Sequence, residues 1–436
     1  MNLRDNWRIV LLVLFTLASA VVLLAPLAVQ GTAVGNGLQY GLQLSGGTQI
    51  KAPLVGTTAE NVNFSQSQLQ DQPALRRSLA TDLGVEPNDI GLRPQAGAVE
   101  VYSKNVTHGQ FVDALNNNGF DVAASDVRDG VTTQTAQEVA QTLSHKINQA
   151  GLTGGSARVA TAGSTHLVVV EVPNANRSQV VNMIKDRGVV QLVAHYPATG
   201  GNATGYNETV LVTNEDFAKV SGAEQPNPQN GQPEPHVTVT LKQEAAANYA
   251  DQLERLGFTS GAGTGPNACP TQEAMQHPDT AEGYCLYTRL NGKVVAAHYM
   301  SADLGRSMEN GDFAKRPTFV MTARNMSEAR QLALSLDAGA LTTSPDIQNG
   351  TVYSLQASQG QQYKFASLIA GLIAWIAVSG VVFFRYGSAR VAVPMLLTAA
   401  AEVFLLLGFS AAVGLALNLS HIAGFIAVIG TGVDDL

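Results

Sequence analysis

The hydrophobic residues of this 436-residue chain are concentrated at its two ends, and the long middle part is polar. Residues 9–29, 365–384 and 391–417 are each long enough to cross a bilayer, which takes about 20 apolar residues in a helix. A fourth apolar stretch, residues 422–436, is the last part of the sequence. We therefore predict three transmembrane helices and the start of a fourth.

The first apolar stretch has an alternative interpretation as a cleaved signal peptide. Ala18-Ser19-Ala20 has the small-x-small form of a cleavage site. A signal core is usually about 7–15 residues long, and cleavage here would leave an apolar segment exposed on the mature protein. A retained transmembrane helix is the better prediction.

Basic residues beside the apolar stretches predict the orientation. Arg4 and Arg8 precede the first stretch, and Arg385 and Arg390 lie between the second and third. Cytoplasmic loops carry an excess of such residues. We expect a multi-pass protein of the cell membrane with a cytoplasmic N-terminus and a large extracytoplasmic domain.

Within the polar middle, some stretches have the hydrophobic period of helices and others have that of strands. Residues 133–150 read as a helix, 166–172 as a strand, 177–186 as a helix and 189–194 as a strand. This order is typical of split βαβ, ferredoxin-like units. A second, looser copy lies within residues 237–336. The predicted fold class is a transmembrane α-helical bundle with a large α+β ectodomain containing ferredoxin-like βαβ units.

These patterns suggest a division of the chain into five segments. Residues 1–30 would form the cytoplasmic N-terminus and the first transmembrane helix, and residues 364–436 the later helices. Residues 31–130 and 237–363 would together form the base of the ectodomain. Residues 131–236 would form a more mobile head, with hinge motion at its boundaries.

Charge and cysteine content narrow the classes of function. The formal net charge is −8, whereas a nucleic-acid-binding protein is expected to present a basic surface. Cys269 and Cys285 are the only cysteines. In an extracytoplasmic domain such a pair is expected to form a disulfide, and two free thiols are the alternative.

Conventional catalytic motifs are missing from the sequence. It contains no phosphate-binding GxxxxGK[ST], no HExxH, no CxxC and no GxSxG motif. The eight histidines are scattered, without the i, i+4 spacing of a helical metal site. We expect a protein that is not an enzyme and needs no metal or cofactor.

Three acidic residues fall within the apolar stretches near the C-terminus: Glu402, Asp434 and Asp435. A charged side chain at mid-bilayer costs roughly 2.5–3.5 kcal/mol, so intramembrane acids are functional candidates. Counting about 1.5 Å per helical residue places Glu402 and Asp434 at similar depth. We interpret the three acids as candidates for a proton relay, with Asp434 the principal one. The alternative for Glu402 is a contact with polar groups of other helices.

A glycine-rich motif, GLQLSGG, follows the first apolar stretch. It resembles the G-L-D-L-x-G-G motif of the SecD/SecF family of protein-export membrane proteins. Segments within residues 290–297, 328–341 and 422–434 resemble further motifs of that family in the same order. The motif positions are Gly41, Leu42, Gln43, Leu44, Gly46 and Gly47. Gln43 stands where the family usually has Asp, so a role for charge there is in doubt.

The resemblance implies a function that composition cannot show. Family members belong to the resistance-nodulation-division (RND) superfamily and have six transmembrane helices, so an RND-like bundle, a C-terminal truncation and an archaeal source are expected. The implied function is that of an auxiliary subunit of the Sec translocase, which uses the proton-motive force to promote export or release of polypeptides on the extracytoplasmic side. The implied partners are a SecF-like subunit, the Sec translocon channel, unfolded polypeptide substrate and membrane lipids.

Two alternative functions remain open at this point. One is another RND-type proton-driven exporter, acting on lipids or small molecules. The other is a membrane-anchored binding protein without a transport cycle, for which intramembrane acids would have no use.

Overall fold

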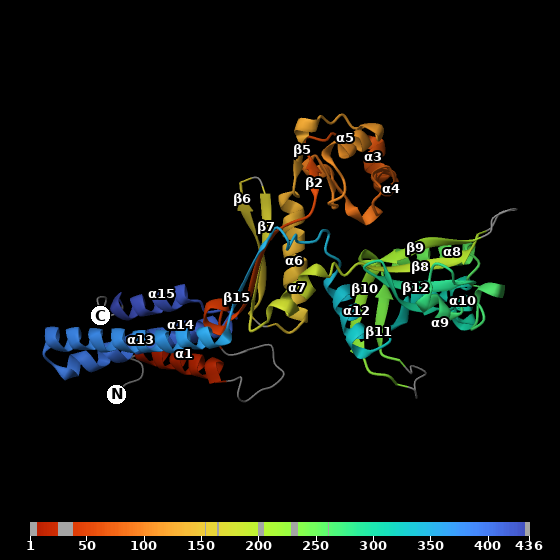
Figure 1. Ribbon diagram of the computed structural model, residues 1–436. Helices are drawn as coiled ribbons and strands as arrows, with labels where there is room; N and C mark the ends of the chain where they lie inside the picture. Colours follow the sequence, from red (N-terminus) through yellow and green to blue (C-terminus); the bar gives the residue numbers. More distant parts are fainter. Residues whose placement is uncertain are drawn as a thin grey trace.

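The computed structural model consists of a bundle of apolar helices and a polar α/β domain that extends away from it (Figure 1). It describes residues 7–24, 38–152, 154–163, 165–198, 205–227, 234–259 and 261–431. Among these residues, the polar domain contains four sheets, which form three units.

The described part of the bundle consists of four helices: α1 (Trp7–Leu24), α13 (Ala357–Tyr386), α14 (Ala389–Ala412) and α15 (Leu419–Thr431). Within the described residues, α13 and α14 are long and apolar enough to cross a membrane, whereas α1 and α15 contain shorter apolar stretches. Their positions agree with the four apolar stretches of the sequence. Large apolar side chains on α13, such as Leu368 and Phe384, are exposed, as expected of a surface that faces lipid or further helices.

Small residues bring α1 and α14 close together. A Cβ atom added to Gly408 would lie 2.3 Å from the Cβ of Ser19. Real Cβ atoms do not approach so closely, so the two backbones can pack at this point only because position 408 is glycine. Between apolar helices, where lipid competes equally for hydrophobic contact, such close packing is a main source of association.

The unit nearest the helices, here called the membrane-proximal unit, is an antiparallel sheet covered by two helices. Its strand order is β15-β1-β7-β6. The elements are β1 (Gly47–Pro53), β6 (Ser156–Ala162), β7 (Thr165–Pro173), β15 (Thr351–Leu355), α6 (Thr133–Gln149) and α7 (Arg177–Lys185). Its core includes Ile50, Val170, Leu143 and Ile147, all almost fully buried.

Local chemistry explains why α6 forms where the sequence predicts a helix. The hydroxyl of Thr132 accepts a hydrogen bond from the backbone N–H of Thr135 and so caps the first turn. Val139, Leu143 and Ile147 recur at helical spacing and are fully buried. Gly151, with φ of 71°, follows the end of the helix.

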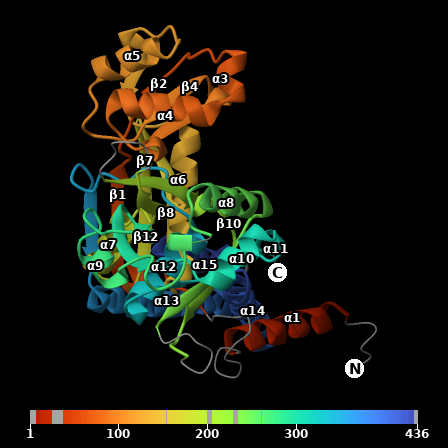
Figure 2. The same cartoon turned by 90° about the vertical axis from the view of Figure 1, so that its right-hand side faces the viewer.

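The second unit, here called the upper unit, comprises residues 57–129. Its elements are β2 (Thr57–Ala59), α3 (Gln66–Gln70), α4 (Gln72–Leu83), β3 (Ile90–Arg93), β4 (Ala98–Val101), α5 (His108–Asn117) and β5 (Val127–Asp129). The sheet order is β3-β4-β2-β5 and every pair is antiparallel. Leu79, Val99, Phe111 and Leu115 belong to a core confined to this unit. Figures 1 and 2 show it at the end of the molecule far from α13 and α14.

The third unit, here called the distal unit, comprises residues 190–338 and has two sheets, ordered β13-β12-β8-β9 and β10-β11-β14. Its strands are β8 (Val190–Pro197), β9 (Tyr206–Thr213), β10 (Phe217–Glu224), β11 (His236–Leu241), β12 (Cys285–Leu290), β13 (Lys293–His298) and β14 (Thr318–Thr322). Its helices are α8 (Gln243–Arg255), α9 (Thr271–Gln276), α10 (Ala302–Glu309), α11 (Asp312–Lys315) and α12 (Met326–Ala338). Cys269 and Cys285 are joined by a disulfide and are buried beside Tyr287.

Strand pairing corrects the division into head and base. The predicted helices and strands of residues 133–194 are present, but β7 pairs with β1 and β8 pairs with β12. Both pairs join the predicted head, residues 131–236, to the predicted base. The strands β7 and β8 therefore belong to different sheets and do not form one βαβ unit. Hydrophobic period identifies an element locally, whereas its partner strand is a long-range property.

Candidate coupling site between the helices and the polar domain

The glycine motif forms a short turn where the polar domain meets the helical bundle. It folds as one turn of helix, α2 (Leu42–Ser45), with Leu44 fully buried. The hydroxyl of Ser45 lies 2.7 Å from the carbonyl oxygen of Tyr40 and 2.9 Å from that of Gly41, and donates to them. The side chains of α2 thus fix a compact turn immediately before β1.

Two glycines of the motif are required by close backbone contacts. Gly46 has φ of 73°, and a Cβ atom there would lie 2.7 Å from the backbone nitrogen of Ala357, the first residue of α13. Gly47 has φ of 133°, and its Cβ would lie 2.3 Å from the carbonyl oxygen of Val172 in β7. L-residues with a side chain rarely adopt such φ values, so both conformation and space demand glycine.

The first turn of α13 packs closely against the same motif. A Cβ atom on Gly360 would lie 2.6 Å from the carbonyl oxygen of Leu44 and 2.7 Å from the nitrogen of Gly46. One turn further on, the ammonium of Lys364 lies 3.9 Å from the centre of the Tyr40 ring, a cation–π contact.

The motif also contacts the segment between α14 and α15. The N–H of Gly41 donates to the carbonyl oxygen of Leu417 at 2.8 Å, and the N–H of Leu417 donates to that of Gln39 at 2.8 Å. A Cβ atom on Gly41 would lie 1.9 Å from Oδ1 of Asn418. The turn is therefore held between α13 on one side and the start of α15 on the other.

Gln43 occupies the position at which the related motif has Asp. Its Oε1 accepts a hydrogen bond of 3.2 Å from the N–H of Leu419, the first residue of α15. The first N–H groups of a helix have no partner within the helix and carry its positive end, so an acceptor from another element stabilises them. Gln43 can fill this role without a charge.

The sheet continues directly into α13. The strand β15 pairs with β1 from Gly47↔Leu355 to Lys51↔Thr351, and only Gln356 separates it from the helix. The helix α13 is therefore joined through a single residue to β15, the edge strand of the membrane-proximal sheet, so a displacement of α13 would act on that strand first. Contacts of α13, the motif and α15 make this junction a candidate site of mechanical coupling.

Of the three predicted proton-relay residues, Glu402 belongs to the described part of the chain. Asp434 and Asp435 lie outside the described residues. Glu402 lies in α14, partly buried, about 20 Å along the axis from the start of the helix. It has no hydrogen bond or ion pair with any residue that the structure describes. The expected common depth of Glu402 and Asp434 stays a prediction. Across the described ranges, no three His, Cys, Asp or Glu side chains are grouped to hold a metal ion.

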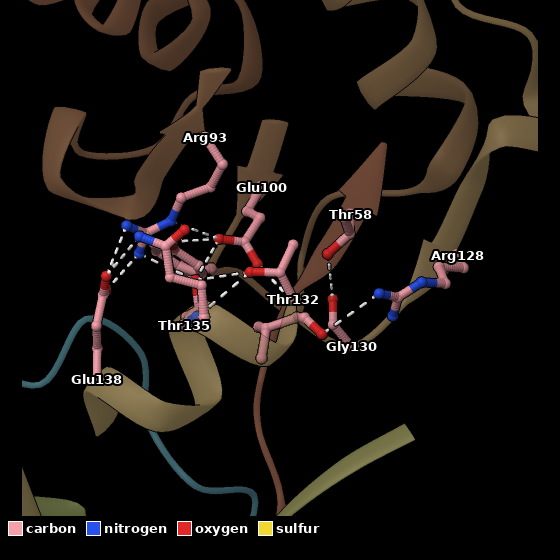
Figure 3. A network of polar contacts seen from close by, with 11 residues as sticks. Thr58, Arg93, Glu100, Arg128, Gly130, Thr132, Thr135 and Glu138 are labelled. Atoms are coloured by element: carbon pink, nitrogen blue, oxygen red, sulfur yellow. Dashed lines mark hydrogen bonds and ion pairs between the residues drawn. The ribbon is translucent and has the colours of Figure 1, made fainter. Parts of the chain in front are cut away.

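A buried polar network at the boundary of the upper unit was not expected from the sequence (Figure 3). Glu100 in β4 is fully buried. Its carboxylate accepts hydrogen bonds from the Tyr102 hydroxyl at 2.8 Å, the Thr132 N–H at 2.6 Å and the Thr135 hydroxyl at 2.5 Å, and lies 3.3 Å from Nε of Arg93. Four partners compensate the cost of burying this charge.

Arg93 extends the network to α6. Its guanidinium donates to Glu138 at 2.8 Å and to the Thr135 hydroxyl at 3.0 Å. Burial disfavours the charge of Arg93, but Tyr102, Glu138 and Glu100 outweigh burial and raise its pKa. Burial and Glu100 raise the pKa of Tyr102. These residues are spread over strands and a helix with no motif spacing, which is why the sequence gives no signal for them.

Lys146 ties α6 to the turn before the distal unit. Its side chain is almost fully buried, and Nζ donates to the carbonyl oxygens of Asp186 at 2.7 Å and Arg187 at 3.2 Å. Burial lowers the pKa of Lys146 from 10.5 to about 8, and the nearby Asp186 carboxylate opposes this effect.

This pKa predicts a pH-dependent stability. An unfolded lysine keeps its proton up to about pH 10.4, so between about pH 8 and 10.4 the unfolded chain binds more protons than the folded one. The free energy of unfolding should therefore rise with pH across this window, by up to about 3 kcal/mol. Denaturant unfolding at fixed salt should show the rise in the wild type and not in Lys146→Met. Tyrosine ionisation affects both chains and cancels in the difference. Equal pH dependence of the two would contradict the assignment.

The fold and site define a class of protein: a mixed α/β domain fastened through a glycine turn to apolar helices of membrane-spanning length. A family model described as "Protein export membrane protein SecD/SecF, C-terminal" matches residues 337–436. The chain is 41% identical to the protein-export membrane protein SecD of Haloferax volcanii and 38% identical to that of Haloquadratum walsbyi. Each match covers all of this chain and 83% of the relative. The chain belongs to the SecD family of protein-export membrane proteins.

Among solved structures, the chain is similar to SecDF, a translocon-associated membrane protein, from Thermus. The identity is 16% and the TM-score 0.41, over 99% of this chain and 47% of that one. A super-membrane-facing form of SecDF is 17% identical to this chain and has a TM-score of 0.40. The chain thus spans about half the length of SecDF, and family membership rests on the sequence relatives.

Proposed function

We propose that this chain is an auxiliary subunit of the Sec protein translocase that uses the proton-motive force to promote export or release of polypeptides on the extracytoplasmic side. The observation that carries the proposal is the junction of α13, the glycine motif and α15. At this junction a helix of membrane-spanning length continues into a sheet, with backbone-to-backbone contacts at Gly46, Gly47 and Gly360. Membership of the SecD family supports the export role.

The energy source in this proposal is proton movement through the helical bundle. Asp434 is the principal carrier, and Glu402 and Asp435 are the other candidates. A carboxyl group in a low-dielectric bundle favours its neutral form, so it can change protonation state near physiological pH. Moving one charge through ~100 mV provides about 2.3 kcal/mol, which can bias a two-state equilibrium several-tenfold.

The proposed topology places the N-terminus in the cytoplasm and the polar domain outside. It rests on Arg4 and Arg8 before the first span and on Arg385 and Arg390 around the α13–α14 turn. Proposed partners are a SecF-like subunit, the translocon channel, unfolded polypeptide substrate and membrane lipids. The proposed work is mechanical, so no reaction, metal or cofactor is part of it.

Replacement of Asp434 by Asn tests the proposal. The change keeps the side-chain shape and removes the titratable charge. Export of a secreted protein should be measured in cells or vesicles with and without the proton-motive force. In Asp434→Asn, the increase in export that the proton-motive force provides should be lost. Membrane insertion and the amount of the subunit should be unchanged. Glu402→Gln, made in parallel, shows whether the second acid takes part. Export by Asp434→Asn that still responds fully to the proton-motive force would refute the relay.

A further inference from the structure

A tryptophan without a hydrogen-bond partner lies in the middle of α13. Trp375 is one of two tryptophans in the chain, and its Nε1 atom is buried without a hydrogen bond to any residue that the structure describes. A buried indole N–H usually has an acceptor, because an unsatisfied donor is costly. Between apolar helices in a membrane, water does not supply one. An acceptor is therefore expected from the helices packed against α13.

The packing of α13 on α14 defines which residues face each other at this height. The two helices lie side by side and are joined by a turn of two residues (Figure 1). Val378 and Val382 of α13 belong to one hydrophobic cluster with Ala392 and Met395 of α14. Trp375 precedes Val378 by three residues, so it lies one turn further along the same face of α13.

The facing side of α14, followed in the same direction, leads to Glu402. Ala399 and Glu402 follow Met395 after four and then three residues, so all three lie on one face of α14. Ala399 is fully buried and Glu402 is partly buried. Counted from the turn between the helices, Trp375 and Glu402 differ in height by less than about one helical turn.

The hydroxyl groups near this height are bonded to their own helices. The Ser379 hydroxyl donates to the carbonyl oxygen of Trp375 at 2.6 Å, and the Thr398 hydroxyl donates to that of Met395 at 2.8 Å. Glu402, in contrast, has no hydrogen bond or ion pair with a described residue. Its carboxyl oxygens can accept a hydrogen bond in both the neutral and the charged form. Ionisable residues inside a membrane almost always pair with a polar group of the bundle.

We propose that the indole N–H of Trp375 donates a hydrogen bond to the carboxyl group of Glu402 and holds this group between α13 and α14. Trp375 is thus a positioning residue that acts through Glu402, and this role rests on the proposed proton relay. The hydrogen bond is charge-assisted when the carboxyl group is ionised and weaker when it is protonated. The contact between the two helices therefore changes in strength as Glu402 releases and takes up a proton.

Fluorescence of the full chain in lipid vesicles tests the pairing independently of export. Trp7→Phe leaves Trp375 as the only tryptophan, and indole emission responds to charge and hydrogen bonding at the N–H. Emission of Trp7→Phe should change with pH as the carboxyl group titrates. The change should be lost when Glu402→Gln is added, because glutamine keeps the shape and the acceptor oxygen but does not titrate.

Two controls exclude other titrating groups. The remaining charged residues of the described helices lie toward the helix ends: Arg8, Lys364, Arg385, Arg390 and His421. His421→Gln and Asp434→Asn, each combined with Trp7→Phe, should keep the pH response. A response that survives Glu402→Gln, or no response in Trp7→Phe, would overturn the pairing. Loss of the response in Asp434→Asn but not in Glu402→Gln would overturn it by assigning the indole to the other acid.

Trp375→Phe tests the positioning role, because it keeps an aromatic ring and removes the N–H. Export that depends on the proton-motive force should fall to the level of Glu402→Gln. The double variant should lose no more, because both changes remove the same interaction. Normal export by Trp375→Phe, when Glu402→Gln has lost the response, would overturn the positioning role. Normal export by both variants, with the fluorescence response present, would exclude Glu402 from the relay and leave the pairing in place.

Discussion

Replacement of Glu100 by Ala should lower the free energy of unfolding by about 3–5 kcal/mol, the cost of removing one partner of a buried ion pair. The carboxylate of Glu100 is fully buried and accepts hydrogen bonds from Tyr102, Thr132 and Thr135. Its loss leaves these donors unsatisfied and Arg93 with fewer acceptors. Denaturant unfolding, followed together with hydrogen exchange of the upper unit, should show the decrease.

Glu138→Ala is the matched control for this network. Glu138 binds the same guanidinium of Arg93, but its side chain is 37% exposed, so water can replace it. We expect a loss within about 1 kcal/mol, the range of solvent-exposed ion pairs. Equal effects of the two substitutions would show that burial of Glu100 does not set the strength of the network.

The helices and strands of residues 133–194 were predictable from hydrophobic period. The helix α6 agrees with the predicted 133–150 to within a residue, and β7 covers the predicted strand 166–172. Pairing of the strands was not predictable. The turn that follows α7, with φ of 71° at Gly188, leads the chain into a different sheet. No local pattern distinguishes such a turn from one that returns to the same sheet.

The candidate site was predictable only in part for a similar reason. The glycine motif was recognisable as a short segment, but Gly360 and Asn418, which contact it, lie more than 300 residues away in the sequence. A glycine in an apolar helix is usually a packing residue, and only its neighbour in space reveals another role. Glu402 was recognisable by its charge, while the buried Glu100 stands in an ordinary strand pattern of valines and alanine.

Gly360 to Ala should therefore separate the coupling function from membrane insertion. The added Cβ atom would lie 2.6 Å from the carbonyl oxygen of Leu44 and 2.7 Å from the nitrogen of Gly46, both backbone atoms that cannot rotate away. Overpacking of this kind costs about 1–3 kcal/mol, and the first turn of α13 must move away from the motif to relieve it. This movement loosens the packing of α13 on the glycine motif and leaves the connection from β15 through Gln356 as the remaining link between the helix and the sheet.

Gly371→Ala is the matched control, because Gly371 lies in the same helix and a Cβ atom there would meet nothing within 4 Å. Alanine is favoured over glycine inside a helix by roughly 0.8–1.0 kcal/mol, so this variant should be as stable as the wild type or more so. Both variants should insert into the membrane in normal amounts. Export that depends on the proton-motive force should be lost in Gly360→Ala and kept in Gly371→Ala. If the two variants export equally well, the tight contact of α13 with the motif does not transmit force, and coupling must run through the continuation of β15 into α13 or through α15 and Gln43.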